Sequence, residues 1–406
     1  MSTPENAVST VLLVDDNATN LQVLFKTLQP SGHRLLAAKS GEEAVKTATQ
    51  ITPDLILLDI MMPPGMDGYE TLKRLKSEAA LADVPVIFLS SLDATESKVK
   101  GLELGAVDYI SKPFEAAEVT ARVDTHLKLR RLQAEITQRN EQLAQANNRM
   151  KSDLEAAGRV QQALLPRSLP DCDGYDFGWA YRPCDELGGD ALDIFKINDD
   201  TVGFYLLDVS GHGVPASLLA VTATRSLQPR PDRSSIVLEP GWDPGSAKVV
   251  PPGEVIRRLN VMNPMDDDRN PHFITMIYGL LQLSSGSIRY ACAGHPGPIV
   301  VPSDGAPRIV DGGSPPVGLM ADAEFEELEL RLKPGDRIYI HSDGLNEQRD
   351  GRGQELGRER LRDALASVGD GAMTSADLAI GRVDSWSGAE EIGDDLSIVA
   401  LFRATR

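Results

Sequence analysis

Residues 201–213 have the sequence TVGFYLLDVSGHG, in which an apolar run ends at Asp208 and a glycine-rich turn follows. A buried strand that carries a carboxylate at its own end, followed by a tight turn, holds that carboxylate rigidly, as a metal ligand requires. The glycines at 211 and 213 let the backbone approach an ion or a phosphate without a Cβ in the way. We therefore expect Asp208 to be a metal ligand at the end of a strand.

Three further acidic loops share this design, and two of them adjoin the apolar runs 337–341 and 396–402. The loops are Gly188-Gly189-Asp190, Ser342-Asp343-Gly344 and Gly393-Asp394-Asp395. Carboxylate oxygens without thiolates suit Mg²⁺ or Mn²⁺. Four such loops in one region predict a two-metal hydrolytic centre.

The composition describes a globular protein with room for two or three domains in its 406 residues. The net charge of −19 argues against nucleic acid or an anionic membrane as a partner. Its three cysteines form neither a metal-binding spacing nor a disulfide framework. We find no signal-peptide pattern and no apolar run of membrane-spanning length, and we expect a cytoplasmic protein.

The first third of the chain alternates short apolar runs with segments of helical spacing, such as 17–28 and 42–49. The apolar runs are 11–14, 35–38, 55–58, 84–89 and 107–110. This alternation predicts a doubly wound parallel sheet, in which chemistry takes place at the carboxyl ends of the strands. The side chains at those ends are Asp15, Asp16, Asp59, Ser90, Ser91 and Lys112. They predict a small acidic metal pocket with a cation opposite.

These residues resemble the receiver domain of response regulators in two-component signalling, over residues 9–125, with a flavodoxin-like fold. The resemblance implies that Asp59 accepts the phosphoryl group and, with Asp15 and Asp16, binds Mg²⁺. It also implies that Ser90, Tyr109 and Lys112 are the switch residues. The loop from Asp59 to Gly68 is one residue longer than is usual, but every residue with a chemical role is present. The alternative is a receiver that no longer accepts phosphate.

Residues 126–165 have a different pattern, with apolar residues at seven-residue spacing and no proline or glycine from 126 to 157. The repeating positions are Leu129, Ile136, Leu143, Met150, Ala157 and Leu164, with Leu132, Ala146 and Val160 in the second seam. The pattern predicts a helical linker that forms a parallel coiled-coil homodimer. Arg139 and Asp153 interrupt the seam. The alternatives are a spacer or a single helix packed on its own domain.

The remaining residues, 166–406, alternate strand-like and helical segments, which predicts an α+β sandwich. We expect helices at 214–227, 254–263, 358–367 and 374–386, with strands in 175–208, in 273–342 and at the end. Residues 228–252 are rich in Pro, Ser, Gly and Arg, and we expect an exposed, mobile loop there.

Six motifs of this region, in order, resemble the PPM-type, protein phosphatase 2C-like Ser/Thr phosphatases of the bacterial sporulation and stress-response branch. They lie at 187–190, 208–213, 273–275, 293–296, 342–344 and 393–397. The resemblance implies an α/β/β/α sandwich that binds two Mn²⁺ or Mg²⁺ ions. The implied ligands are Asp190, Asp208, Asp343, Asp394 and the carbonyl of Val209, with Asp208 bridging the two ions and, together with Asp190, counted as catalytic.

Other residues of these motifs have weaker implied roles. Asp193 and Asp395 are expected to orient the ligands. We do not assign His212 as a general acid. His295 lies in a Gly-His-Pro turn, where a histidine is more often structural than a site residue, and Thr275 is expected to be a packing or turn residue. Arg182 precedes the first acidic loop, but no motif makes it a clamp for the substrate phosphate.

The leading hypothesis is a response regulator whose phosphorylation by a sensor histidine kinase controls a Ser/Thr phosphatase. The family resemblance implies a phosphorylated STAS-domain anti-sigma-factor antagonist as substrate. Gly188-Gly189-Asp190 also opens like the signature of a diguanylate cyclase, but Ala191 and Leu192 follow it, so the required glutamate is absent. A third hypothesis is a catalytically silent domain that binds a partner.

Overall fold

The computed structural model describes residues 8–90, 95–230, 234–239, 248–266, 270–368, 371–388 and 392–405. The chain forms two compact units, residues 1–147 and 148–406, and each is described by itself. Within the described residues, no helix combines the length and the apolar character needed to cross a bilayer.

The first unit contains a parallel sheet with the strand order β2-β1-β3-β4-β5. Its strands are β1 (Thr10–Val14), β2 (Arg34–Ala38), β3 (Leu55–Asp59), β4 (Val86–Ser90) and β5 (Asp108–Ser111). Its helices are α1 (Ala18–Leu28), α2 (Gly41–Gln50), α3 (Gly68–Ser77) and α4 (Thr95–Glu103), with a short 3₁₀ turn at Gln29–Ser31. Apolar side chains are buried on both faces of this sheet, because strands such as β3 have continuous apolar sequences. The predicted doubly wound receiver fold is confirmed.

Helix α5 (Ala116–Gln162) is a single helix of 47 residues. It begins in the first unit, where Val119, Val123 and Leu127 pack against the sheet, and it continues without interruption into the predicted linker. The seven-residue seam then leaves the core: the side chains of Ile136 and Leu143 are 59% and 67% exposed. The chain itself therefore leaves these apolar residues uncovered.

The second unit contains two antiparallel sheets, with strand orders β13-β10-β9-β8-β7 and β12-β11-β14-β15-β6. The strands of the first sheet are β7 (Ala191–Asn198), β8 (Thr201–Val209), β9 (Ile274–Gln282), β10 (Ser287–Ala293) and β13 (Glu327–Arg331). Those of the second are β6 (Tyr175–Arg182), β11 (Ile299–Val301), β12 (Arg308–Ile309), β14 (Arg337–His341) and β15 (Leu396–Arg403). The helices are α6 (Val214–Leu227), α7 (Pro252–Met262), α8 (Gly344–Glu347), α9 (Arg358–Ala366) and α10 (Ala372–Ser387).

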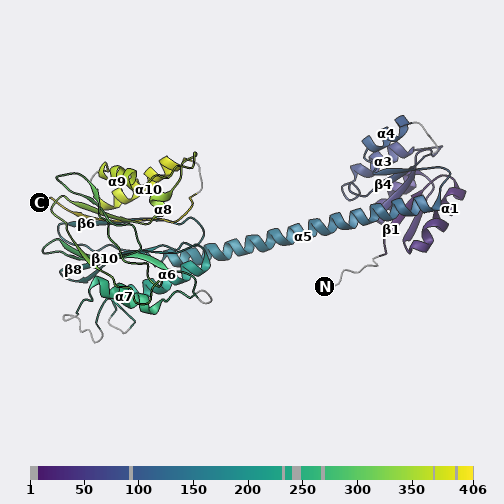
Figure 1. Cartoon of the computed structure of the whole chain (residues 1–406). Helices are drawn as coiled ribbons and strands as arrows, with labels where there is room; N and C mark the ends of the chain where they lie inside the picture. The colour runs from purple at the N-terminus through teal and green to yellow at the C-terminus, as the bar shows by residue number, and fades with distance from the viewer. Residues whose placement is uncertain are drawn as a thin grey trace. The chain divides into compact units, whose positions relative to one another are not determined.

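The two sheets pack face to face and are covered on their outer faces by helices (Figure 1). Helices α6 and α7 cover the first sheet, and α9 and α10 cover the second. Strand β8 shows how the sequence builds these layers: Tyr205 and Leu207 face the helices, whereas Phe204 and Leu206 face the other sheet. The predicted α/β/β/α sandwich is confirmed.

The expectation for residues 228–252 is wrong in part. Ile236, Val237 and Leu238 are buried in the core beneath α6 and α7, and Leu238 bridges to Val249. The apolar triplet is short and surrounded by polar, proline and glycine residues, so the composition of the whole segment hides it. Residues 231–233 and 240–247 lie outside the described part of the chain.

Candidate metal centres

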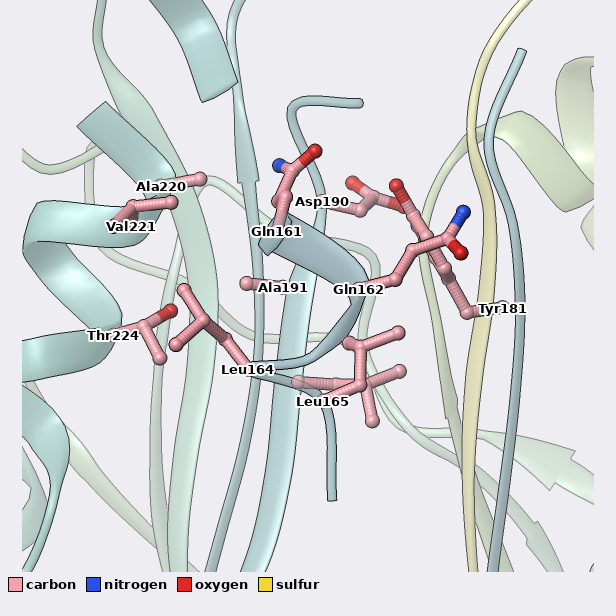
Figure 2. A pocket seen from close by; sticks show the side chains of 11 residues that line it. Gln161, Gln162, Leu164, Leu165, Tyr181, Asp190, Ala191, Ala220, Val221 and Thr224 are labelled. Atoms are coloured by element: carbon pink, nitrogen blue, oxygen red, sulfur yellow. The ribbon is translucent and has the colours of Figure 1, made fainter. Parts of the chain in front are cut away.

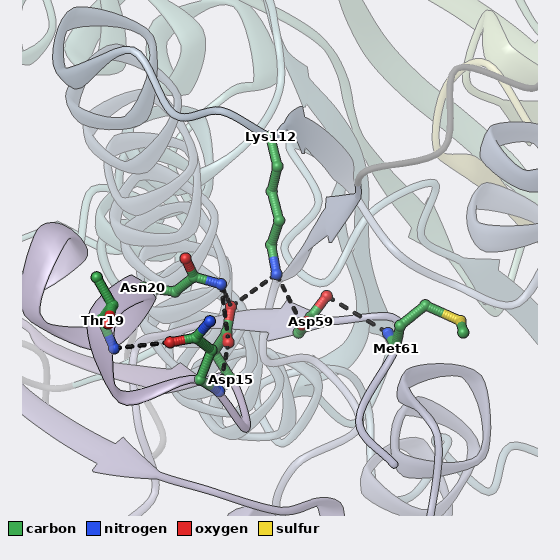
Figure 3. A network of polar contacts seen from close by, with 7 residues as sticks. Asp15, Thr19, Asn20, Asp59, Met61 and Lys112 are labelled. Carbon is green, nitrogen blue, oxygen red and sulfur yellow. Dashed lines mark hydrogen bonds and ion pairs between the residues drawn. The ribbon is translucent and has the colours of Figure 1, made fainter.

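The first acidic site lies at the carboxyl ends of β1 and β3 (Figure 3). The Nζ atom of Lys112 lies 2.7 Å from an oxygen of Asp15 and 2.7 Å from an oxygen of Asp59. The amide of Asn20 donates to both oxygens of Asp15, at 3.1 and 3.0 Å. Asp15, Asp16 and Asp59 offer ligand atoms that all lie within 4.8 Å of one another. This set of oxygens fits a hard divalent cation such as Mg²⁺.

The charges of this site are partly balanced by the protein. Burial raises the pKa of Asp59, and Lys112 acts against that rise. Burial alone would lower the pKa of Lys112, but its hydrogen bonds with Asp15 and Asp59 outweigh burial and raise it. Lys112 therefore stays positively charged and holds two buried carboxylates together.

The predicted switch residues flank this site. Ser90 is buried at the end of β4, and its carbonyl accepts the backbone N–H of Lys112 at 2.8 Å. Tyr109 lies half-buried on β5, with the guanidinium of Arg122 5.7 Å from its ring centre. Ser91 lies outside the described residues. The sheet edge therefore brings Asp15, Asp59, Ser90 and Lys112 together from four different strand ends, as predicted.

The second acidic site lies at one end of the space between the two sheets of the sandwich. Asp208 follows Phe204 and Leu206 on β8 at two-residue spacing, so its side chain is on the face toward the other sheet. Asp190 directly precedes β7, Asp343 follows β14, and Asp394 precedes β15. A Cβ on Gly189 would lie 2.9 Å from the carbonyl oxygen of Val209, so only glycine lets these two loops come so close.

Electrostatics show that these carboxylates, which are far apart in the sequence, converge in space. Burial and the charges of Asp343, Asp394 and Asp395 raise the pKa of Asp208 to about 7. Burial and the charge of Asp394 raise the pKa of Asp343 to about 6. Burial, followed by Asp208 and Asp395, raises the pKa of Asp190 well above its usual value. Like charges oppose each other's ionisation, and a cation between them relieves that opposition.

One buried atom supports the same conclusion. Oδ2 of Asp190 is buried and has no hydrogen-bond partner among the described residues. A buried carboxylate oxygen without a donor is costly unless a cation binds it. The residues therefore fit a divalent metal centre. The four predicted ligands do not form a single tight group, but a two-metal centre spreads its ligands over ions roughly 3.5–4 Å apart.

Asp395 braces the loop before Asp190, as expected for an orienting residue. Its two oxygens accept the backbone N–H groups of Cys184 at 2.9 Å and of Asp190 at 3.1 Å. The thiol of Cys184 joins Asp394 and Asp395 in a group of possible ligands within 4.8 Å, which the spacing of cysteines in the sequence did not reveal. Burial and Asp395 raise the pKa of this thiol to about 12, so it stays protonated at neutral pH.

Three other residues singled out in the sequence form no hydrogen bond or ion pair with the four predicted ligands among the described residues. Arg182 forms a two-pronged ion pair with Asp384 of α10, which keeps it from the role of phosphate clamp. His212 is exposed, with Nδ1 3.4 Å from an oxygen of Asp185. Asp193 accepts the backbone N–H of Ile194 at 2.8 Å.

Two contacts of the site were missed from the sequence. His272 bonds through Nδ1 to the carbonyl of Ser210 at 2.6 Å and so holds the turn that follows Asp208. Gln161, in the last turn of α5, donates to the carbonyl of Gly188 at 2.7 Å and accepts the N–H of Gly188 at 3.3 Å. Figure 2 shows Gln161 and Asp190 lining the same small pocket. Neither contact has a signal in local sequence, because each joins residues far apart in the chain.

Comparison with known proteins identifies both units. Residues 198–403, which are 206 of the 406 residues, match the family described as stage II sporulation protein E (SpoIIE). The chain belongs to the SpoIIE family. Residues 11–124 match the response regulator receiver domain. The protein therefore combines a receiver domain with a SpoIIE domain, which is of the PPM, or PP2C, type.

Individual relatives cover only parts of the chain. The transcriptional regulatory protein PhoP for alkaline phosphatase synthesis, from Bacillus subtilis, is 38% identical over 161 residues, 40% of this chain and 60% of PhoP. Protein IcfG of Synechocystis sp. is 25% identical over 266 residues, 62% of this chain and 41% of IcfG. The chain thus spans less than two thirds of the length of either relative.

The fold of the SpoIIE domain is similar to that of the SiaA-PP2C domain of Pseudomonas aeruginosa. The two structures superpose with a TM-score of 0.51 at 19% identity, over 64% of this chain and 98% of the other. At this identity the likeness supports the fold alone. The SpoIIE match also argues against the cyclase hypothesis, because it accounts for the acidic loops that a cyclase leaves unexplained.

Proposed function

We propose that this protein is a response regulator whose receiver domain, phosphorylated on Asp59 by a sensor histidine kinase, controls a metal-dependent protein Ser/Thr phosphatase. The observation that carries the proposal is the convergence of Asp190, Asp208, Asp343 and Asp394 from one strand end and three loops of a SpoIIE-family domain. Their mutual repulsion and the unpartnered oxygen of Asp190 suit a centre that holds two divalent cations.

Asp190, Asp208, Asp343, Asp394 and the carbonyl of Val209 would hold two Mn²⁺ or Mg²⁺ ions. When bound, such ions supply an activated water and offset the charge of the phosphoryl group. The chain positions these ligands. Asp208 interacts electrostatically with Asp343 and Asp394. Asp395 accepts hydrogen bonds from the backbone of Cys184 and Asp190, and His272 fixes the turn after Asp208.

In the receiver, Asp15, Asp16 and Asp59 would hold Mg²⁺. Lys112 already lies 2.7 Å from Asp59 and can bond to a phosphoryl group on that carboxylate. Phosphorylation adds about −1.5 to −2 charges and new acceptor oxygens, which favour inward movement of the Ser90 hydroxyl and repacking of Tyr109.

Helix α5 offers a route from the linker to the phosphatase centre. Its last turn holds the Gly188 backbone through Gln161, two residues before Asp190. A Cβ on Gly158 would lie 2.2 Å from the carbonyl oxygen of Glu186, so the helix packs directly on the same loop. A shift of α5 would therefore move the loop that carries Asp190.

We also propose that the exposed seam of α5 forms a parallel homodimer, since apolar residues at seven-residue spacing suit a coiled coil. Leu143→Asp should convert a dimer of the 43.9 kDa chain into a monomer in sedimentation velocity. Gln145→Asp, on the polar face of the same helix, is the matched control and should leave the dimer intact. A dimer that survives Leu143→Asp would contradict this assembly.

The substrate is proposed from the family resemblance: a STAS-domain anti-sigma-factor antagonist phosphorylated on Ser or Thr. Purified chain with the metal-site substitution Asp208→Asn can serve as bait in a pull-down, followed by mapping of the phosphorylation sites of the retained proteins. Recovery of such an antagonist in its phosphorylated form would support this substrate. Recovery of its unphosphorylated form alone would contradict it.

The activity is tested with purified protein, Mn²⁺ and a generic aryl phosphate. Asp208→Ala and Asp343→Ala should lower the rate by more than about 100-fold, beyond the 10- to 100-fold typical of residues that only orient a metal ligand. Asp185→Ala, which removes a half-exposed carboxylate beside the centre, is the matched control and should retain activity. Undiminished turnover in Asp208→Ala would refute the metal assignment. An inactive wild type that still binds its partner would favour the catalytically silent alternative.

A further inference from the structure

A hydrogen-bonded pair, the half-buried Thr275 and the buried His295, lies next to the Asp208 carboxylate. In the antiparallel pairing of β8 with β9, Thr275 is directly opposite Asp208. The Thr275 hydroxyl oxygen lies 3.4 Å from Oδ2 of Asp208 and 2.9 Å from Nδ1 of His295. The His295 side chain is 6% exposed. We propose that Thr275 and His295 are positioning residues that fix the Asp208 carboxylate for metal binding.

The direction of these hydrogen bonds follows from the number of protons available. Nε2 of His295 is buried and has no hydrogen-bond partner among the described residues. An ionised Asp208 can only accept, so the Thr275 hydroxyl donates to it, and the ring proton of His295 is assigned to Nδ1. The Nδ1–H group then donates to the Thr275 oxygen. The single hydroxyl proton of Thr275 is left to donate to Asp208.

The backbone that carries the imidazole is held by hydrogen bonds on both sides of the turn. The Cys292 thiol donates to the carbonyl of His295 at 3.0 Å, and the N–H of Gly294 bonds to the carbonyl of Ser314 at 2.8 Å. Burial, reinforced by the neighbouring His341, lowers the pKa of His295 to about 3. His295 is therefore a fixed, neutral donor, which is what a residue needs in order to orient another side chain.

The hydrogen bond from Thr275 affects both the charge and the orientation of the Asp208 carboxylate. A hydrogen bond from Thr275 favours the ionised carboxylate and fixes one of its oxygens, against the acidic neighbours that disfavour ionisation. Residues that orient a metal ligand in this way typically change metal affinity by about 10- to 100-fold when they are removed. This inference rests on the proposed metal-dependent phosphatase, but it concerns metal affinity, which can be measured without turnover.

The test is isothermal titration of Mn²⁺ into the metal-free full chain, in an Asp59→Ala background that disables the receiver site. Thr275→Val has nearly the same shape but no hydroxyl, and it should weaken Mn²⁺ binding by about 10-fold or more. Thr275→Ser keeps the hydroxyl and should bind Mn²⁺ within about 3-fold of the parent, because the hydrogen bond to Asp208 is retained. His295→Asn, whose amide places an N–H near the position of Nδ1, should retain more affinity than His295→Leu.

A purely structural pair would give a different result. Urea unfolding in EDTA would then be shifted in Thr275→Val, while its Mn²⁺ affinity matched that of the parent, and the proposal would be overturned. Equal weakening in Thr275→Ser and Thr275→Val would overturn it as well, because only one of them lacks the hydroxyl. A parent chain that binds no Mn²⁺ would instead remove the proposed metal centre itself, and the positioning role with it. If a His295 variant fails to fold, the comparison of Thr275→Val with Thr275→Ser decides the proposal.

Discussion

The two acidic sites of this protein are built in opposite ways. Both collect carboxylates at strand ends, but the receiver site contains its own cation. Lys112 lies 2.7 Å from both Asp15 and Asp59. In the second site, no lysine or arginine of the described chain forms an ion pair with the four predicted metal ligands, which are Asp190, Asp208, Asp343 and Asp394.

The two sites therefore differ in how their negative charge is balanced. The receiver has balanced part of its charge before any ligand arrives, so it is suited to accept and release a single divalent ion and a phosphoryl group. The second site leaves its carboxylates opposed to one another, and their pKa values are raised to about 7 for Asp208 and about 6 for Asp343. Its charge balance is left to a bound cation, which is what the proposed metal centre requires.

The largest expected effect comes from removing the receiver's internal cation. Lys112→Met leaves two buried carboxylates opposed, and removal of one partner of a buried ion pair typically costs about 3–5 kcal/mol. All three tryptophans (Trp179, Trp242 and Trp386) lie in the second unit. In urea unfolding, circular dichroism should therefore show an earlier transition of the receiver, while tryptophan fluorescence stays unchanged.

Lys128→Met removes an exposed lysine of the same unit and is the matched control, which should leave both transitions in place. If the receiver of Lys112→Met unfolds at the same urea concentration as that of wild type, the lysine does not compensate these carboxylates.

The phosphoacceptor is tested separately. Acetyl phosphate with Mg²⁺ should label wild type but not Asp59→Ala.

The second effect is the pH dependence of metal binding at the phosphatase centre. The pKa of Asp208 is raised to about 7, so the metal-free site takes up a proton as the pH falls below 7. Metal must displace that proton, and the Mn²⁺ affinity should fall by about tenfold per pH unit below that value. Titrations between pH 8 and 5.5, in buffers of different ionisation enthalpy, measure both the affinity and the protons released.

These titrations use the Asp59→Ala background, so that the receiver does not contribute. Asp193→Asn is a useful comparison. Burial raises the pKa of Asp193 to about 6, but this carboxylate accepts the backbone N–H of Ile194 and is not one of the predicted metal ligands. This variant should keep the pH dependence of the parent. A Mn²⁺ affinity that does not change from pH 8 to 5.5, without proton release, would contradict the raised pKa of Asp208 and the mutual repulsion of these carboxylates.

The sequence predicts the receiver better than it predicts the phosphatase centre, for a physical reason. In a parallel sheet the carboxyl ends of all strands meet at one edge, so the positions of Asp15, Asp59, Ser90 and Lys112 follow from hydrophobic runs alone. In the sandwich, the acidic motifs predict which residues matter. The packing of two sheets and one helix then determines how those residues are braced.

The residues missed from the sequence are those braces. Gln161 and Gly188 are 27 residues apart, and His272 and Ser210 are 62 apart. The buried triplet Ile236–Leu238 was missed because three apolar residues inside a polar segment are too few to define a period. Contacts of this kind depend on tertiary packing and leave no trace in local composition.

The smallest expected effect tests one of these braces. Asp59 is fixed by its own strand, whereas Asp190 precedes a strand and relies on neighbours, among them the bonds of Gln161 to Gly188 at 2.7 and 3.3 Å. Gln161→Met keeps most of the side-chain volume and removes both bonds. The shorter bond alone, at a typical net value of about 1 kcal/mol, should raise the Mn²⁺ concentration for half-maximal activity by roughly fivefold. The measurement is a Mn²⁺ titration of aryl phosphatase activity.

Gln162→Met, at an exposed position of the same helical turn, is the matched control and should titrate like wild type. The comparison becomes sharper when both variants are assayed with and without acetyl phosphate. If α5 carries the receiver's signal through Gln161, the response to acetyl phosphate should shrink in Gln161→Met and persist in Gln162→Met. An unchanged response in Gln161→Met, together with an unchanged Mn²⁺ requirement, would show that the acidic loop holds Asp190 without help from the linker helix.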